Sequence, residues 1–161
     1  MGTDRPSRRT EGGTGLIELR PIDGVDPAIG PLLDSAACEG HLFVRRLIDD
    51  WQTGANRFDR AGEVFLGAFL DGNLAGIGGL NRDPYAADGG TGRLRHVYVS
   101  PDARRSGVGR RLVLRLIAHG RDTFQALRLR TVTPGGAAFY AALGFGKSDE
   151  SDATHRMALG G

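Results

Sequence analysis

The 161-residue chain has one cysteine, one lysine and no long apolar run. The first and last of these shortages exclude an internal disulfide and a membrane-spanning segment. A single cysteine, Cys38, cannot form an internal disulfide, which favours a reducing compartment. No apolar run approaches the length that spans a bilayer, and the first residues lack the apolar stretch of a signal peptide. These absences predict a cytoplasmic protein without a membrane partner.

Lysine is nearly absent, because Lys147 stands beside twenty arginines, and the formal net charge is only +2. So small a charge does not by itself indicate binding to nucleic acid, and we predict no nucleic-acid partner. The guanidinium fork matches phosphate geometry, however. Clusters of arginine are therefore the places where phosphate is expected to bind.

Residues 1–15 contain no apolar residue after Met1, which predicts a disordered leader before a single domain over residues 16–161. Within that domain the apolar spacing changes between the strand and helix periods. Strands are expected at 16–20, 63–70, 74–80, 93–99, 127–132, 145–147 and 154–159, and helices at 29–36, 43–51, 107–119 and 137–143. This order predicts an α/β (α+β) domain with a twisted, mixed, mostly antiparallel sheet of about six to seven strands and about four helices. The strands at 93–99 and 127–132 enclose a helix and should pair in parallel if they are neighbours.

The most informative segment is residues 97–111, a predicted strand and turn followed by a loop that opens into a helix. Two arginines and two glycines stand in residues 104–109, just before the helix. Unpaired N–H groups and a partial positive charge at a helix start attract phosphate, and glycine lets a ligand approach the main chain. The loop therefore predicts an anion, such as a pyrophosphate, held by the amides of residues 105–110. It lacks the P-loop and dinucleotide fingerprints, and the alternative is a helix start whose glycines serve only packing.

Two motifs resemble those of one enzyme superfamily. Arg104-x-x-Gly107-x-Gly109 resembles the Gln/Arg-x-x-Gly-x-Gly/Ala signature of the GNAT (general-control-related N-acetyltransferase) superfamily. Residues 138–145 (Ala-Phe-Tyr-Ala-Ala-Leu-Gly-Phe) resemble the family's Phe-Tyr-x-x-Leu-Gly-Phe ending. The resemblance implies a GNAT-like domain that binds acetyl-CoA in a V-shaped splay between the strands at 93–99 and 127–132.

The resemblance also implies roles for particular residues. An amine of the acceptor would attack the acetyl-CoA thioester directly, with the acetyl carbonyl polarised by amides around Val97 and Val99. Tyr140 occupies the position of a general acid that protonates the leaving thiolate; the alternative is an aromatic packing residue with a satisfied hydroxyl. Cys38 is expected to be a buried or bystander thiol. The predicted cofactor-binding residues are Val97, Tyr98, Val99, Arg104, Arg105, Ser106, Gly107, Val108, Gly109, Arg110, Thr133 and Phe139.

Two positions depart from the family pattern. Arg93 stands where several relatives carry a glutamate general base, and an arginine cannot do that work at neutral pH. Thr133 replaces an asparagine that often contacts the cofactor. Glu63 acting through water is the base we name; Asp83, His96 and the absence of a dedicated base are the alternatives.

The acceptor is expected near the loop after the second helix and the ends of the central strands. The residues named for it are Trp51, Asn56, Arg57, Asn81 and Asp83, which could equally be core and solvated loop residues. The predicted function is an acetyl-CoA-dependent N-acetyltransferase acting on a primary amine of a small molecule or a peptide amino terminus, without a metal. The alternative is a non-catalytic acetyl-CoA-binding sensor or interaction module. Homodimers are common among relatives, but the sequence indicates no surface for one.

Overall fold

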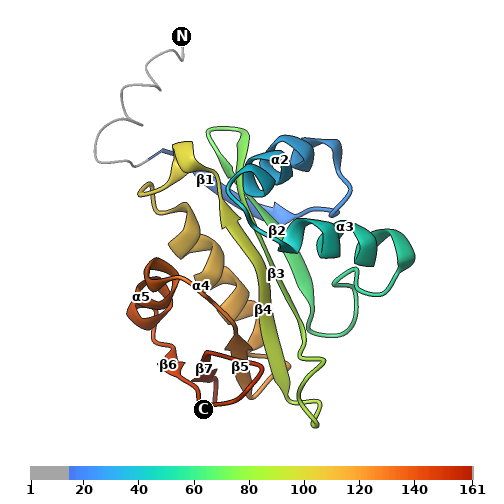
Figure 1. Cartoon of the computed structure of the whole chain (residues 1–161), viewed down its shortest axis with the longest axis vertical. Helices are drawn as coiled ribbons and strands as arrows, with labels where there is room; N and C mark the ends of the chain where they lie inside the picture. The colour runs from blue at the N-terminus through green and yellow to red at the C-terminus, as the bar shows by residue number, and fades with distance from the viewer. Residues whose placement is uncertain (1–14, 161) are drawn as a thin grey trace. The chain divides into compact units, whose positions relative to one another are not determined.

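The computed structural model describes residues 15–160, so the predicted leader lies outside the described residues except for Gly15 (Figure 1). The strands and α-helices follow one another along this part of the chain in the order that the sequence predicts. The elements are β1 (Ile17–Pro21), η1 (Pro27–Ile29), α2 (Gly30–Cys38), α3 (Phe43–Thr53), β2 (Val64–Leu70), β3 (Asn73–Arg82), β4 (Thr91–Val99), η2 (Pro101–Ala103), α4 (Val108–Gly120), β5 (Ala126–Leu129), α5 (Pro134–Ala142), β6 (Gly146–Lys147) and β7 (His155–Ala158). None of the helices between residues 15 and 160 is long and apolar enough to cross a membrane.

The strands of the described chain form one seven-stranded sheet in the order β1-β2-β3-β4-β5-β7-β6. β4 and β5 pair in parallel, with Thr91 opposite Ala126 and Arg93 opposite Arg128. β1 pairs antiparallel with β2, and β7 pairs antiparallel with both β5 and β6. The predicted mixed α/β fold, including the parallel pair around a helix, is confirmed, whereas the V-shaped splay stays a prediction.

Two element boundaries differ from the prediction for identifiable reasons. β5 ends at Leu129 instead of residue 132, because the Thr131 N–H donates to the Thr154 hydroxyl (3.0 Å) and leaves the strand ladder. α5 begins at Pro134 instead of residue 137. The Thr133 hydroxyl caps that helix by accepting from the Gly136 N–H (3.0 Å), and proline is well suited to the first helical position.

Contacts divide the described chain into two compact units that interleave along the sequence. Unit 1 contains residues 15–57, 65–78 and 96–113, and unit 2 contains residues 58–64, 79–95 and 114–160. β3, β4 and α4 each contribute residues to both. Neither unit is therefore a continuous stretch of chain.

The core of unit 1 joins α2 and α3 to the strands beside them (Figure 1). The Trp51 ring of α3 meets the Phe65 ring of β2 edge-on, with the ring centroids 5.4 Å apart. The start of α4 comes close to β3, because a Cβ at Gly76 would lie 3.2 Å from the Val108 side chain and 3.1 Å from the Tyr98 carbonyl. Glycine at position 76 thus lets the first turn of α4 pack directly on the sheet.

Unit 2 places an apolar and a charged face on opposite sides of its strands. Side chains alternate along a strand, so Leu127 of β5 faces away from its neighbour Arg128. Leu127 is fully buried, and a Cβ at Gly120 of α4 would lie 3.4 Å from its side chain. The opposite face carries Arg93, Arg128 and Arg156, which occupy paired positions on three adjacent strands.

Candidate active site

The loop between η2 and α4 has the backbone geometry of an anion site. Arg105 and Gly107 have positive φ angles of 68° and 91°, the alternation that turns successive N–H groups into one concave surface. Arg111 donates to the Gly107 carbonyl (3.0 Å), so the amides of residues 108–110 lie in the first helical turn, which has no intrahelical acceptors for them. A Cβ at Gly107 would meet no atom within 4 Å. The loop therefore fits a phosphate or pyrophosphate that lies directly on the main chain.

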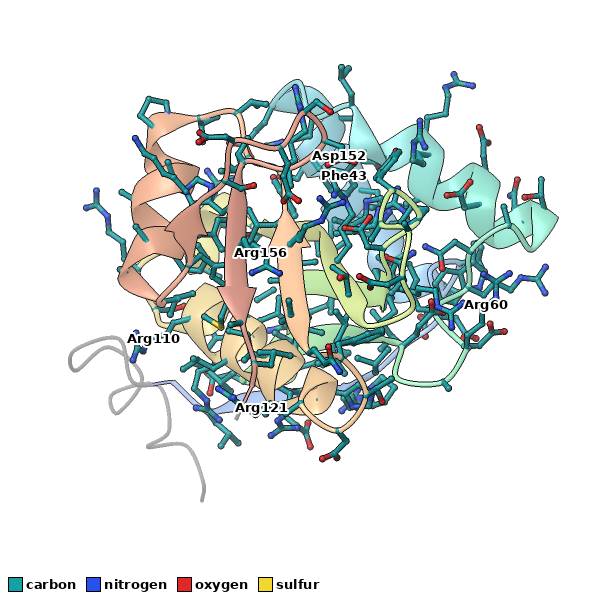
Figure 2. All side chains as sticks on the ribbon, turned by 90° about the horizontal axis from the view of Figure 1, so that it is seen from below. Phe43, Arg60, Arg110, Arg121, Asp152 and Arg156 are labelled. Atoms are coloured by element: carbon teal, nitrogen blue, oxygen red, sulfur yellow. The ribbon has the colours of Figure 1, made fainter. Side chains whose placement is uncertain are left out.

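The same loop packs on the core of unit 1 and carries two exposed arginines. Val108 is 1% exposed in the core of unit 1, and the Ser106 hydroxyl donates to the Ala103 carbonyl. The side chains of Arg105 and Arg110 are exposed and form no ion pair with residues 15–160. Figure 2 shows Arg110 projecting near the start of α4. These two guanidinium groups are available to a bound anion.

Arg104, the first residue of the signature, differs from Arg105 and Arg110 because it forms an ion pair within the protein. Its guanidinium donates to both carboxylate oxygens of Glu39 (2.6 and 3.1 Å) and to the Val99 carbonyl (3.1 Å). The Tyr98 hydroxyl donates to the same carboxylate (2.5 Å) and shares a hydrogen bond with Ser35 (2.8 Å). Arg104 and Tyr98 thus tie the loop and β4 to the end of α2. Glu39 is 65 residues from Arg104 and belongs to no motif, so no signal in the sequence indicates this contact.

The Glu39 contacts predict that the folded protein loses stability at acid pH. The Glu39 pKa is lowered from 4.5 to about 2, mainly by the hydrogen bond from Arg104 and then by that from Tyr98. Because the native carboxyl loses its proton more readily than the unfolded one, its stabilising effect is complete above pH 4.5 and is lost as the pH falls through about 2. Urea unfolding across this pH window should therefore show a steeper loss of stability in the wild type than in Glu39→Gln.

The comparison isolates Glu39, because every other carboxyl is the same in both proteins. The Glu150 pKa is also lowered, by hydrogen bonds from Ser148 and Arg128, and this effect is equal in the two proteins. Parallel profiles of the free energy of unfolding against pH would show that the Arg104–Glu39 pair contributes nothing to stability.

β4 is distorted just before the residues that precede the loop. His96 has a φ angle of 58°, which non-glycine residues seldom adopt and which interrupts the extended strand. Its ring stacks on Phe43 with the centroids 5.3 Å apart. Strained strand positions often occur beside functional sites. His96 lies between residues 91–93 of β4, which pair with β5, and Val97–Val99, where the acetyl-carbonyl amides are predicted.

Tyr140, the predicted general acid, lies on α5 in unit 2 and is 9% exposed. Phe139 and Phe145 meet its ring edge-on, with centroids at 5.0 and 5.7 Å. Burial raises the pKa of the Tyr140 phenol above its normal value, and no hydrogen bond from the described residues contributes to that shift. The hydroxyl therefore keeps its proton further into the alkaline range than an exposed tyrosine does.

The sequence also matches a family model. The model of the acetyltransferase (GNAT) family matches residues 33–145, well over half of the chain. The chain belongs to the GNAT acetyltransferase family. Acetyl-CoA is the acetyl donor of GNAT enzymes, which confirms the cofactor predicted from the two motifs.

Solved structures share the GNAT fold. A protein from Exiguobacterium sp. 255-15 is 26% identical, with a TM-score of 0.76 over 89% of this chain and 93% of that one. An acetyltransferase from Streptococcus agalactiae 2603 is 18% identical, with a TM-score of 0.68 over 91% and 96%. YncA from Salmonella typhimurium, solved with its cofactor acetyl-CoA, is 17% identical, with a TM-score of 0.65 over 89% and 94%. Among curated proteins, none matches this sequence.

Thr133, at a GNAT position that often carries a cofactor-binding asparagine, serves as the N-cap of α5. We expect Thr133→Ala to lower the free energy of unfolding by about 1 kcal/mol, because the cap hydrogen bond is lost. Thr133→Ser keeps the hydroxyl and should restore stability. If CoA affinity also falls in Thr133→Ala and returns in Thr133→Ser, the hydroxyl contacts the cofactor as well; unchanged stability in Thr133→Ala would contradict the capping role.

The carboxylates named as candidate bases already accept hydrogen bonds within this GNAT domain. Glu63 accepts from the main-chain N–H groups of Arg60 (3.0 Å) and Arg82 (2.8 Å), one on each oxygen. Asp83 is 1% exposed and accepts from Arg128 (2.7 Å) and Arg93 (3.4 Å). Arg93 therefore does not merely replace the family's glutamate, because it is part of a buried ion cluster. This geometry favours the alternative in which the amine is deprotonated without a dedicated residue.

The residues named for the acceptor have mostly structural contacts. Trp51 is 9% exposed in the core, and its carbonyl accepts from the Arg57 guanidinium (2.6 Å) at the end of α3. Asn56 is half-buried, and its N–H donates to the Asp50 carbonyl (3.2 Å). Asn81 is buried in unit 2, in the strand just before Asp83, and its side-chain oxygen has no hydrogen-bond partner among residues 15–160. Asn81 therefore has a buried polar atom that no described residue satisfies.

Proposed function

We propose that this GNAT protein is an N-acetyltransferase that transfers the acetyl group of acetyl-CoA to a primary amine of a small molecule or a peptide amino terminus. The loop at residues 104–110 carries the proposal. It combines the family signature with two positive φ angles, an open face at Gly107 and two exposed, unpaired arginines. When bound, acetyl-CoA would supply an acetyl group already activated as a thioester.

The chain would contribute binding, orientation and one proton. The amides of residues 105–110 would hold the pyrophosphate, with Arg105 and Arg110 adding charge. The amides around Val97 and Val99 would orient and polarise the acetyl carbonyl. The Tyr140 hydroxyl would donate its proton to the departing thiolate, because no hydrogen bond from the described residues engages that proton. Both Glu63 oxygens accept main-chain hydrogen bonds, so we propose that the amine is deprotonated without a dedicated residue, with Glu63 acting through water as the alternative.

One observation favours the alternative of a non-catalytic acetyl-CoA-binding module. Arg93 stands at the family's base position and is ion-paired with Asp83, so no carboxylate is free there. The Tyr140 hydroxyl, which no hydrogen bond from the described residues engages, favours the enzyme instead, because its proton is available to a leaving thiolate. Turnover separates the two.

The direct test is thiol release from acetyl-CoA with a panel of small amines, amino acids, polyamines, aminoglycosides and peptides, beside calorimetric titration with CoA. We expect CoA binding and turnover with at least one acceptor. Tight binding without turnover on any class would support the binding module. An absence of CoA binding would overturn the assignment of the loop.

We further propose a cytoplasmic location without a membrane or nucleic-acid partner. Cys38 is exposed, and an exposed free thiol is best preserved in a reducing compartment. Homodimerisation belongs to the same proposal and can be measured by analytical ultracentrifugation.

A further inference from the structure

The main-chain groups at the end of β4 point alternately toward β3 and away from it. The Ser100 N–H donates to the Ala75 carbonyl of β3 (2.8 Å). Successive residues of an antiparallel strand direct their N–H and C=O groups to opposite sides, so those of Val97 and Val99 point away from β3. On that side the neighbour of β4 is β5, which pairs with residues 91–93. The N–H groups of Val97 and Val99 therefore lie outside that ladder and can meet a ligand.

The peptide group between Val99 and Ser100 is held at both ends. Its N–H is bound to β3, and its carbonyl accepts from the Arg104 Nε (3.1 Å). Because a peptide group is planar, the two hydrogen bonds fix its plane and restrict the rotation of Val99 beside it. Arg104 thus orients the stretch whose amides are predicted to polarise the acetyl carbonyl.

Glu39 in turn holds Arg104 and the neighbouring Tyr98. Its carboxylate accepts from both terminal nitrogens of the Arg104 guanidinium (2.6 and 3.1 Å) and from the Tyr98 hydroxyl (2.5 Å). A bidentate pair fixes the plane of the guanidinium, to which Nε also belongs. The Glu39 N–H donates to the carbonyls of Ser35 (3.1 Å) and Ala36 (3.2 Å), so the carboxylate extends from the end of α2. The direction of one carboxylate is thereby passed to the main chain of β4.

The Arg104–Glu39 pair is better suited to orientation than to stability. The two side chains are 44% and 33% exposed. Solvent screens charges that are so exposed, which reduces their contribution to the free energy of unfolding. Screening does not relax the bidentate geometry, which orients the guanidinium whatever the pair contributes to stability.

We propose that Glu39 is a positioning residue for acetyl transfer. Acting chiefly through Arg104, its carboxylate fixes the direction of the N–H groups around Val97 and Val99. The proposal rests on the proposed function for the place of the acetyl group, and it gives Glu39 no contact with acetyl-CoA. Loss of the carboxylate should disturb the acetyl group more than the rest of the cofactor, because the loop that holds the pyrophosphate is anchored separately by the buried Val108.

Isotope-edited infrared spectroscopy of bound acetyl-CoA, labelled at the acetyl carbonyl, measures the positioning without turnover. In the wild type we expect the carbonyl stretch to lie below that of free acetyl-CoA, because main-chain N–H donors polarise the bond. In Glu39→Gln the stretch should broaden and return most of the way to the free value. Calorimetric titration with CoA, which lacks the acetyl group, should show an affinity within about fivefold of the wild type, the limit for one half-exposed ion pair.

Glu18→Gln is the matched control, because it breaks an ion pair of the same kind within unit 1. The exposed side chains of Glu18 and Arg20 are 2.9 Å apart, and both belong to β1. This variant should leave the carbonyl stretch and the CoA affinity unchanged.

A double-mutant cycle tests the route through Arg104. Glutamine, the other residue of the family signature at this position, carries an N–H donor at the same distance along the side chain as the Arg104 Nε. Arg104→Gln can therefore keep the bond to the Val99 carbonyl while it loses the contacts to Glu39. In this background Glu39→Gln should shift the carbonyl stretch much less than it does in the wild type. Equal shifts in the two backgrounds would show that Glu39 does not act through Arg104 and would overturn the proposal.

The remaining outcomes separate the positioning role from the proposed function. If the wild-type stretch is shifted and Glu39→Gln leaves it there, the positioning role is wrong and the proposed function stands. If bound acetyl-CoA has the free stretch in the wild type, the predicted place of the acetyl carbonyl is wrong, and the positioning role fails with it. A loss of CoA affinity in Glu39→Gln as large as the loss for acetyl-CoA, and well beyond fivefold, would indicate a general loosening of the site and would also overturn the proposal.

Discussion

Gly107→Val is expected to weaken CoA binding about a hundredfold or more, the effect of losing roughly two hydrogen bonds to a charged group. The reason is local. A side chain at a φ angle of 91° forces the main chain out of its present conformation, and its methyl groups would occupy the open face above the loop amides. Both changes remove donors from the pyrophosphate, and calorimetric titration with CoA measures the loss.

The chain offers a closely matched control in Gly72. This glycine lies in the turn between β2 and β3, has a φ angle of 89°, and would likewise meet no atom within 4 Å if it carried a Cβ. Gly72→Val should therefore have a similar strain, about 1–3 kcal/mol of stability in urea unfolding, without touching the loop. Equal CoA affinities for the two variants would show that backbone strain, and not the phosphate cradle, accounts for any effect at Gly107.

The fold followed from the sequence where the signal was local. Strand and helix periods, a tight turn at Asp71–Gly72 and the helix between β4 and β5 are encoded within short windows. A strand, a helix and a second strand in succession allow few arrangements, which is why the parallel pairing was predictable. The predicted boundaries were wrong where a side chain takes the place of a main-chain hydrogen-bond partner, as the Thr154 hydroxyl does beside the end of β5.

The candidate site, too, could be predicted only where its residues belong to one contiguous stretch of sequence. The amides of the loop and Tyr140 belong to contiguous motifs, so their residue types and spacing could be recognised. The contacts of the side chains depend on strand register and on distant partners. Neither the Glu39 carboxylate that holds Arg104 nor the pairing of Arg128 with Arg156 has a local signature. The loop amides and Tyr140 could therefore be proposed from the sequence, whereas the partners of the charged side chains needed the structure.

Tyr140→Phe is expected to slow acetyl transfer by about 10²–10⁴-fold, the usual contribution of a general acid. The change removes one oxygen from a ring that is otherwise packed between Phe139 and Phe145, so CoA affinity should be nearly unchanged. Burial raises the Tyr140 pKa, so the wild-type rate should persist from neutral into alkaline solution and fall only as the phenol loses its proton. The rate of Tyr140→Phe should lack that alkaline fall.

Stability measurements distinguish this role from a packing role. Tyr140→Phe should leave the free energy of unfolding unchanged or slightly higher, because no hydrogen bond from the described residues holds the hydroxyl. Tyr98→Phe is the opposite case, since it removes hydrogen bonds to Ser35 and Glu39 and should lower stability by about 1–3 kcal/mol. If Tyr140→Phe reduces stability as Tyr98→Phe does and its turnover matches the wild type at every pH, the hydroxyl is structural. A large loss of turnover with intact stability and CoA affinity leaves proton donation as the function of that oxygen.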